Sequence, residues 1–157
     1  MPTQKNKKDS GEHGARKKAM DLLLRMDRTE KNLRDKLREK EYTTQQIDDA
    51  VSYVKSYHYL DDERFVSNYI RFHENEKSRA RLRMDLIRKG ADRDLIDRLL
   101  SELYDGDEEE QIRRILEKKH YDPGMDDREK RRIYALLLRK GFPVSKIIRS
   151  MRIDNTV

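Results

Sequence analysis

The sequence predicts an all-α protein of three tandem three-helix repeats that form an elongated, curved array. Two observations lead to this prediction. Apolar residues recur at three- and four-residue spacings through most of the 157 residues, which is the pattern of amphipathic helices. The chain also aligns with itself at intervals of about 50 residues, and a repeat of that length is typical of stacked helical units.

Each repeat contains two pairs of apolar residues, four apart within a pair, with a short break between the pairs. This spacing predicts two packed helices joined by a tight turn. The breaks follow Lys40, Lys89 and Lys140, so the repeats are offset by 49 and 51 residues. The aligned apolar residues are Leu33, Leu37, Ile47 and Val51, then Leu82, Leu86, Ile96 and Leu100, then Ile133, Leu137, Ile147 and Met151.

The pattern predicts nine helices, three in each repeat, after a flexible basic tail at residues 1–13. A single compact bundle with accidental self-similarity is the alternative architecture. The N-caps are expected at Thr29, Ser78 and Asp126 or Asp127, and Gly90 and Gly141 fit the left-handed conformation that ends a helix. The expected repeats are 14–58, 59–104 and 105–153, and the expected helices are 15–26, 29–40, 44–57, 61–76, 78–89, 92–104, 107–119, 127–140 and 143–152.

The charges follow the repeat. The chain carries a net charge of +6 and a pI of about 9.4, which favours polyanionic partners. Residues 77–89 and 128–140 each have six basic side chains against one acidic, and residues 28–40 have six against three. Residues 92–110 instead have nine acidic side chains against two basic. The middle helices are therefore predicted to form a positive stripe, although solvated helix faces held by local ion pairs are the simpler reading of any single arginine.

Catalytic and metal-binding patterns are missing from the sequence. It has no phosphate-binding loop, no dinucleotide-binding glycine pattern, no zinc-protease helix and no nucleophile elbow. None of the four histidines has a second histidine three or four residues on, and there is no cysteine. The acidic residues near Asp107 are expected to solvate a linker and favour a helix N-terminus. We expect no catalytic residue, no metal and no cofactor.

The aromatic residues are eight tyrosines and three phenylalanines. Exposed rings beside arginines could stack on single-stranded bases. Phe65 and Tyr69 are four residues apart, as are Tyr53 and Tyr57, and this helical spacing predicts that these rings pack in the core.

The composition also indicates a cellular compartment. The absence of cysteine fits a reducing environment, no apolar run approaches the roughly 20 residues of a membrane span, and the polar start has no signal-peptide core. We expect a cytoplasmic protein that does not enter a membrane.

Three strings occur in order along the chain. They are Tyr59-Leu60-Asp61-Asp62-Glu63-Arg64-Phe65, Lys77-Ser78-Arg79-Ala80-Arg81-Leu82-Arg83 with Leu86 and Arg88-Lys89-Gly90, and Lys130-Arg131-Arg132 with Leu138-Arg139-Lys140-Gly141-Phe142 and Ile147. In their order and spacing they resemble the RecX recombination regulators, over about residues 15–152. Two positions depart from that family: Glu41 stands where its first repeat usually has glycine, and residues 77–79 lack the glycine often found before the second basic helix.

This resemblance implies a non-enzymatic regulator in DNA repair, recombination and the SOS response. Such proteins bind within the groove of the RecA–DNA filament and suppress its growth, ATP hydrolysis and strand exchange. We expect a monomer that binds single- or double-stranded DNA weakly and without sequence specificity. The residues expected to contact the filament or DNA are Arg79, Arg81, Arg83, Arg88 and Lys89, then Arg131, Arg132, Arg139 and Lys140.

Two other functions stay open. Residues 79–103 could form a helix-turn-helix DNA-binding regulator, although the helix that would read the bases, 92–104, is acidic and would be repelled by phosphates. A helical solenoid that binds only proteins is the third possibility. The sequence does not separate DNA phosphates from acidic protein loops as the partners of the arginines.

Overall fold

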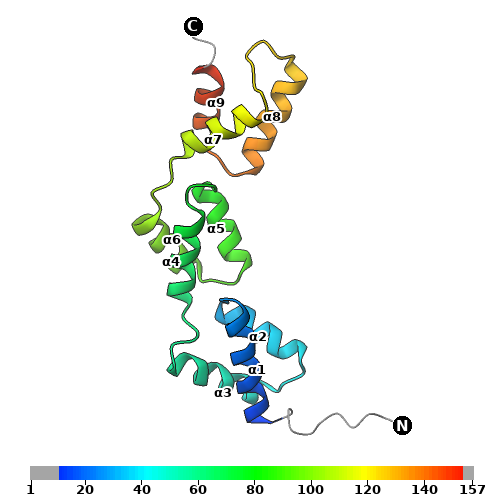
Figure 1. Ribbon diagram of the computed structural model, residues 1–157, viewed down its shortest axis with the longest axis vertical. Helices are drawn as coiled ribbons and strands as arrows, with labels where there is room; N and C mark the ends of the chain where they lie inside the picture. The colour runs from blue at the N-terminus through cyan, green and yellow to red at the C-terminus, as the bar shows by residue number, and fades with distance from the viewer. Residues whose placement is uncertain (1–10, 154–157) are drawn as a thin grey trace, which may run out of the picture. The chain divides into compact units, whose positions relative to one another are not determined.

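The computed structural model describes residues 11–153, which form nine α-helices and, within that range, no strand (Figure 1). This confirms the predicted all-α fold of three-helix repeats, with α1–α3, α4–α6 and α7–α9 as the three repeats. The helices are α1 (Glu12–Arg25), α2 (Glu30–Glu39), α3 (Thr44–Ser56), α4 (Asp62–His73), α5 (Arg79–Arg88), α6 (Arg93–Leu103), α7 (Glu108–Lys118), α8 (Asp127–Arg139) and α9 (Val144–Ile153).

The described residues divide into two compact units. Unit 1 runs to Val66 and also includes Leu86–Leu95, the segment that holds the turn between α5 and α6. Unit 2 consists of Ser67–Asp85 and the chain from Ile96 onward. Each unit is described by itself.

Unit 1 is built around α1, α2 and α3, which all contact one another. Leu33 and Leu37 of α2 are fully buried, as their four-residue spacing on one helix face predicts. Small side chains at Ala15, Ala19 and Ala50 let the helix backbones approach closely. The remaining buried residues of this core are Leu22, Ile47, Val51, Val54 and Leu60.

Unit 2 has a core in its third repeat, where α9 contacts both α7 and α8. Ile133 and Leu137 contribute one stripe of α8 to this core, so the opposite side of the helix is left outward. The core also contains Ile112, Leu116, Phe142 and Ile147.

The predicted helix ends are largely confirmed. The oxygens of Thr29, Ser78 and Asp126 accept hydrogen bonds from backbone N–H groups three residues on, at 3.2, 3.1 and 2.9 Å. Gly90 and Gly141 have φ of 95° and 85°, as expected for left-handed helix ends.

Glu41, the departure from the family pattern, has φ of 65°. A left-handed conformation at a residue with a β-carbon costs about 1 kcal/mol. Glu41 is exposed, whereas a β-carbon at Gly90 would lie 2.7 Å from Lys31, and one at Gly141 would lie 2.8 Å from the Ser78 hydroxyl oxygen. Close approach therefore requires glycine at both later turns.

Two helix bounds differ from the prediction by three residues. α1 begins at Glu12 instead of 15, inside the predicted tail, of which residues 1–10 lie outside the described range. α4 ends at His73 instead of 76, and the carbonyl of Glu74 just after it accepts a hydrogen bond from the Gln111 side chain at 2.8 Å.

Candidate functional site

The nine predicted contact residues lie on two equivalent helices and the turns that follow them. With the offset of 51 residues, three pairs of them are equivalent: Arg81 and Arg132, Arg88 and Arg139, and Lys89 and Lys140. On α5 lie Arg79, Arg81, Arg83 and Arg88, with Lys89 in the next turn, and on α8 lie Arg131, Arg132 and Arg139, with Lys140 in the next turn.

On α5, three of the four arginines bind groups of the protein itself. Arg79 donates to the Ser101 hydroxyl at 3.1 Å, Arg81 pairs with Asp85 at 3.1 Å, and Arg83 pairs with Asp97 at 2.7 Å. The bond to Asp97 raises the pKa of Arg83 above its usual value. These arginines are partly occupied by structural contacts.

Asp85 is the centre of a small charged cluster. Only 8% of this residue is exposed, and its carboxylate accepts hydrogen bonds from Lys77 at 2.8 Å and from the Tyr69 hydroxyl at 3.2 Å. Burial raises the pKa of Asp85, but the hydrogen bond and charge of Lys77 and the charge of Arg81 outweigh it, so the pKa lies below its usual value. Asp85 is therefore ionised at neutral pH and neutralises part of the α5 charge.

The cations on α8 are in a different state. Arg131, Arg132 and Arg139 are exposed, and within residues 11–153 none of them forms an ion pair or a side-chain hydrogen bond. Arg88, at the end of α5, is likewise exposed and unpaired in that range. These four guanidinium groups can take an anionic partner without first breaking an internal contact.

In the turns after α5 and after α8, a backbone carbonyl accepts a hydrogen bond from the N-cap hydroxyl of the preceding repeat. The Thr29 hydroxyl donates to the carbonyl of Lys89, and the Ser78 hydroxyl donates to the carbonyl of Lys140 at 2.7 Å. The second contact brings Arg81 and Lys140 to one hollow of about 150 Å³, which Lys77 and Phe142 also line. Two of the predicted residues thus lie together in unit 2.

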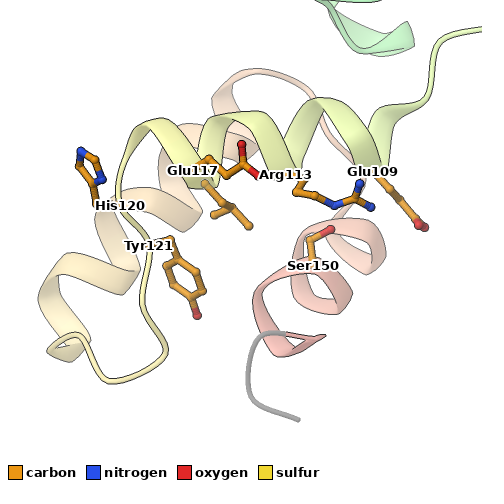
Figure 2. A pocket seen from close by; sticks show the side chains of 7 residues that line it. Glu109, Arg113, Glu117, His120, Tyr121 and Ser150 are labelled. Atoms are coloured by element: carbon orange, nitrogen blue, oxygen red, sulfur yellow. The ribbon is translucent and has the colours of Figure 1, made fainter. Parts of the chain in front are cut away.

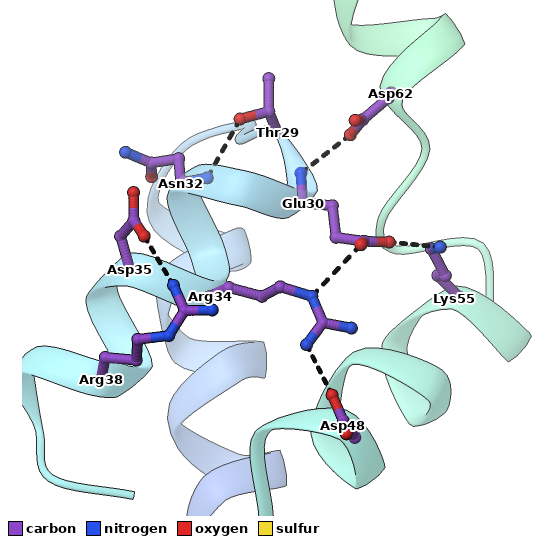
Figure 3. Close-up of polar contacts among 9 residues, drawn as sticks. All are labelled: Thr29, Glu30, Asn32, Arg34, Asp35, Arg38, Asp48, Lys55 and Asp62. Atoms are coloured by element: carbon purple, nitrogen blue, oxygen red, sulfur yellow. Dashed lines mark hydrogen bonds and ion pairs between the residues drawn. The ribbon is translucent and has the colours of Figure 1, made fainter. Parts of the chain in front are cut away.

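The arginines of the first repeat are also held by contacts within the protein. Arg34 binds both Glu30 and Asp48, and Arg38 binds Asp35 at 2.8 Å (Figure 3). Burial raises the pKa of Glu30, but its bonds to Lys55 and Arg34 outweigh this and lower the pKa.

Asp62 reaches the start of α2, where it accepts a hydrogen bond from the backbone N–H of Glu30 at 2.8 Å (Figure 3). Half-burial raises the pKa of Asp62 above its usual value, against the effect of this bond. Asp62 thus belongs to the packing of unit 1.

A second hollow, of about 390 Å³, lies in the third repeat and was not predicted. Figure 2 shows Glu109, Arg113, Glu117 and His120 following one another along α7 and its end, with Tyr121 and Ser150 below them. Two of its charged residues are already used, because Glu109 pairs with Arg149 at 2.7 Å and Arg113 pairs with Glu110. Its mixed charges do not extend the basic surface.

The interpretation of the aromatic residues was partly wrong. Tyr57 contacts the Tyr53 ring, with 5.0 Å between centroids, but stays 60% exposed because it ends α3. Tyr53, Phe65 and Tyr69 are half-buried, in better agreement with core packing.

Sequence reasoning also missed Lys77, which holds Asp85. These two residues are eight apart, and no helical spacing rule pairs them, because Lys77 lies before α5 begins. The lone acidic residue in a run of six cations was the available signal.

Within residues 11–153, no group of three or more histidine, cysteine or acidic residues could hold a metal ion. No helix there is both long and apolar enough to cross a membrane.

Comparison with protein families matches each repeat separately. The matched families are described as "RecX, first three-helix domain" at residues 15–53, "RecX, second three-helix domain" at 61–100 and "RecX, third three-helix domain" at 107–149.

Among similar proteins, "Regulatory protein RecX" of Caldanaerobacter subterraneus subsp. tengcongensis is 34% identical over 145 residues, which is 88% of this chain and 70% of that protein. The protein of the same name from Trichlorobacter lovleyi is 33% identical, over 85% of this chain and 90% of its own. The match covers only 65% of the Clostridium acetobutylicum protein, which is 29% identical.

Two crystal structures share the fold. RecX from Lactobacillus salivarius superposes with a TM-score of 0.73 at 20% identity, covering 96% of this chain and 99% of that one. A second structure of regulatory protein RecX gives a TM-score of 0.70 at 22% identity, covering 86% and 68%. Since three consecutive domain families and relatives above 30% identity agree, this chain belongs to the RecX family of regulatory proteins.

Proposed function

We propose that this protein binds the RecA–DNA filament and lowers its ATP hydrolysis, strand exchange and extension, acting as a cytoplasmic monomer. Membership of the RecX family supports the proposal. The structural observation that supports it best is the set of exposed, unpaired arginines on the equivalent helices α5 and α8 within residues 11–153. A nucleoprotein filament offers phosphates and carboxylates to such side chains.

Weak DNA binding without sequence preference follows from the same charges, since phosphate contacts carry no base information. A helix-turn-helix reading fits the structure less well. α6 would have to enter the major groove, but Asp94, Asp97 and Glu102 are exposed on it. Phosphates would repel this helix. In the nonspecific mode proposed here, the affinity of the protein for DNA should instead fall steeply as salt is added, for duplexes of any sequence.

The test adds this protein to RecA assembled on single-stranded DNA and measures ATP hydrolysis and strand exchange. We expect inhibition at up to one protein per RecA. Charge reversal at Arg88→Glu or Arg131→Glu should raise the half-inhibitory concentration about threefold to tenfold each, because each removes an exposed cation that can contact a phosphate or carboxylate of the filament. Arg81 is less suitable for this test, because it pairs with the buried Asp85.

Lys118→Glu is the matched control. Lys118 is exposed at the end of α7, and its replacement by Glu changes the net charge by the same amount. It should inhibit like the unchanged protein. If the unchanged protein leaves ATP hydrolysis and strand exchange untouched, the proposed function is wrong.

A further inference from the structure

One side of α8, together with Lys119 and Met125 from the chain before it, lines a groove that a stripe of cations alone does not account for. The groove has a volume of about 580 Å³, and we call it the α8 groove. Its floor consists of Met125, Ile133, Ala135 and Leu136, and its charged residues are Lys119, Glu129, Arg132 and Arg139.

The floor is apolar and the rim is mostly cationic. Ile133 is 8% exposed and Leu136 is partly exposed, so the floor can still accept an apolar side chain. Arg132 and Arg139 are seven residues apart, two turns along one face of α8. Within residues 11–153, Lys119, Arg132 and Arg139 have no ion-pair partner.

The equivalent place on α5 carries a carboxylate where α8 has an apolar floor residue. With the offset of 51 residues, Arg132 corresponds to Arg81 and Leu136 corresponds to Asp85. On α5 the carboxylate of Asp85 neutralises Arg81 and Lys77. On α8 a leucine replaces that carboxylate, which both frees Arg132 and supplies apolar surface beside it.

We infer that the α8 groove binds a short acidic protein segment with apolar side chains, rather than DNA. A DNA backbone would use the cations but leave the apolar floor exposed, because phosphate contacts are purely polar. An acidic segment uses both, with leucine-like side chains on the floor and carboxylates on the three cations, the arrangement of apolar centre and polar rim found at protein interfaces. The inference specifies which partner Arg132 and Arg139 of the proposed contact residues bind. It rests on the proposed function for the claim that this segment belongs to the RecA filament.

The probe is a fluorescein-labelled acidic peptide of about twelve residues with two leucines four apart, enough to span the roughly 15 Å from Glu129 to Arg139. Fluorescence anisotropy measures its binding to the full chain. We expect binding that weakens about tenfold or more when the leucines become serines, because the floor is then unused. A single-stranded oligothymidylate of the same charge is the nucleic-acid probe.

Three variants of α8 locate the binding. Arg132→Glu and Leu136→Asp should each weaken peptide binding about tenfold or more, the second by giving Arg132 an internal carboxylate as on α5. If Leu136→Asp disturbs folding, Ala135→Glu serves in its place. Ala135 is exposed, so this change also puts a carboxylate in the groove but alters no buried side chain. Arg128→Glu, on α8 but outside the groove, is the matched control and should bind like the unchanged protein.

Two results would overturn the inference. The first is that the serine and leucine peptides bind equally well. The second is that Leu136→Asp loses binding of the oligothymidylate but keeps binding of the peptide. The RecA assay separates this inference from the proposed function. Peptide binding by a protein that does not inhibit RecA refutes only the function, and inhibition that survives Leu136→Asp and Ala135→Glu refutes only the inference.

Discussion

Helices α5 and α8 occupy the same place in successive repeats, and the stretches 77–89 and 128–140 each carry six basic side chains against one acidic. They use this charge differently. Arg79, Arg81 and Arg83 of α5 bind Ser101, Asp85 and Asp97, whereas Arg131, Arg132 and Arg139 of α8 bind nothing within residues 11–153. Equal net charge therefore does not mean equal availability to a partner.

Part of the difference comes from where each helix places its acidic residues. On α5 the acidic residue is Asp85, buried among cations, and on α8 the acidic residues are Asp127 and Glu129, exposed in the first turn. A buried carboxylate holds its neighbours through short bonds in a medium that screens charge poorly. An exposed one at a helix start interacts with the helix dipole and water instead.

The largest effect in this comparison is expected from Asp85→Asn. The free energy of unfolding of this variant should be about 2 kcal/mol lower at pH 7, because Lys77 and Arg81 lose their charged partner. Since the folded pKa of Asp85 lies below the ordinary value of 3.8, its contribution is fully present above that pH and is lost as the pH falls through the folded pKa. Urea unfolding followed by circular dichroism at several pH values measures this. An equal loss in Asp97→Asn, which changes an exposed carboxylate, would contradict the assignment.

A smaller effect is expected at the N-caps of the same two helices. Ser78→Ala should cost about 1.5 kcal/mol, because it removes both the cap and the buried bond to the Lys140 carbonyl. Asp126→Ala removes a cap alone and should cost about 1 kcal/mol. Ser78→Thr keeps the hydroxyl, as Thr29 does in the first repeat, and should recover most of the loss. Matching losses for the two alanine variants in urea unfolding would argue against a second role of Ser78.

The smallest effect concerns the exposed pair of Arg83 and Asp97. A double-mutant cycle with Arg83→Ala and Asp97→Ala should give a coupling energy much smaller than the loss in Asp85→Asn, since both side chains are largely solvated. Added salt should reduce it further. A coupling energy as large as that loss would make this pair a structural contact like that of Asp85.

The fold was predictable because its signals are local. The apolar spacing around Leu82 and Ile133, the capping residues and the glycines at 90 and 141 each act over a few residues of chain. The state of the basic residues was not, because it depends on tertiary partners such as Asp97 for Arg83. The aligned change from Asp85 to Leu136 was visible in the sequence, but its meaning depends on which side of each helix is buried.

The equivalent hydroxyls of Thr29 and Ser78 also affect when each repeat can finish folding during synthesis. Each accepts a bond from its own helix within three residues, but donates to a carbonyl 60 or 62 residues further along the chain. A ribosome adds that length in about 3 to 12 seconds at ordinary rates. Each of the first two repeats can therefore form its helices as it emerges, yet completes its buried bonding only when the turn of the following repeat has been made.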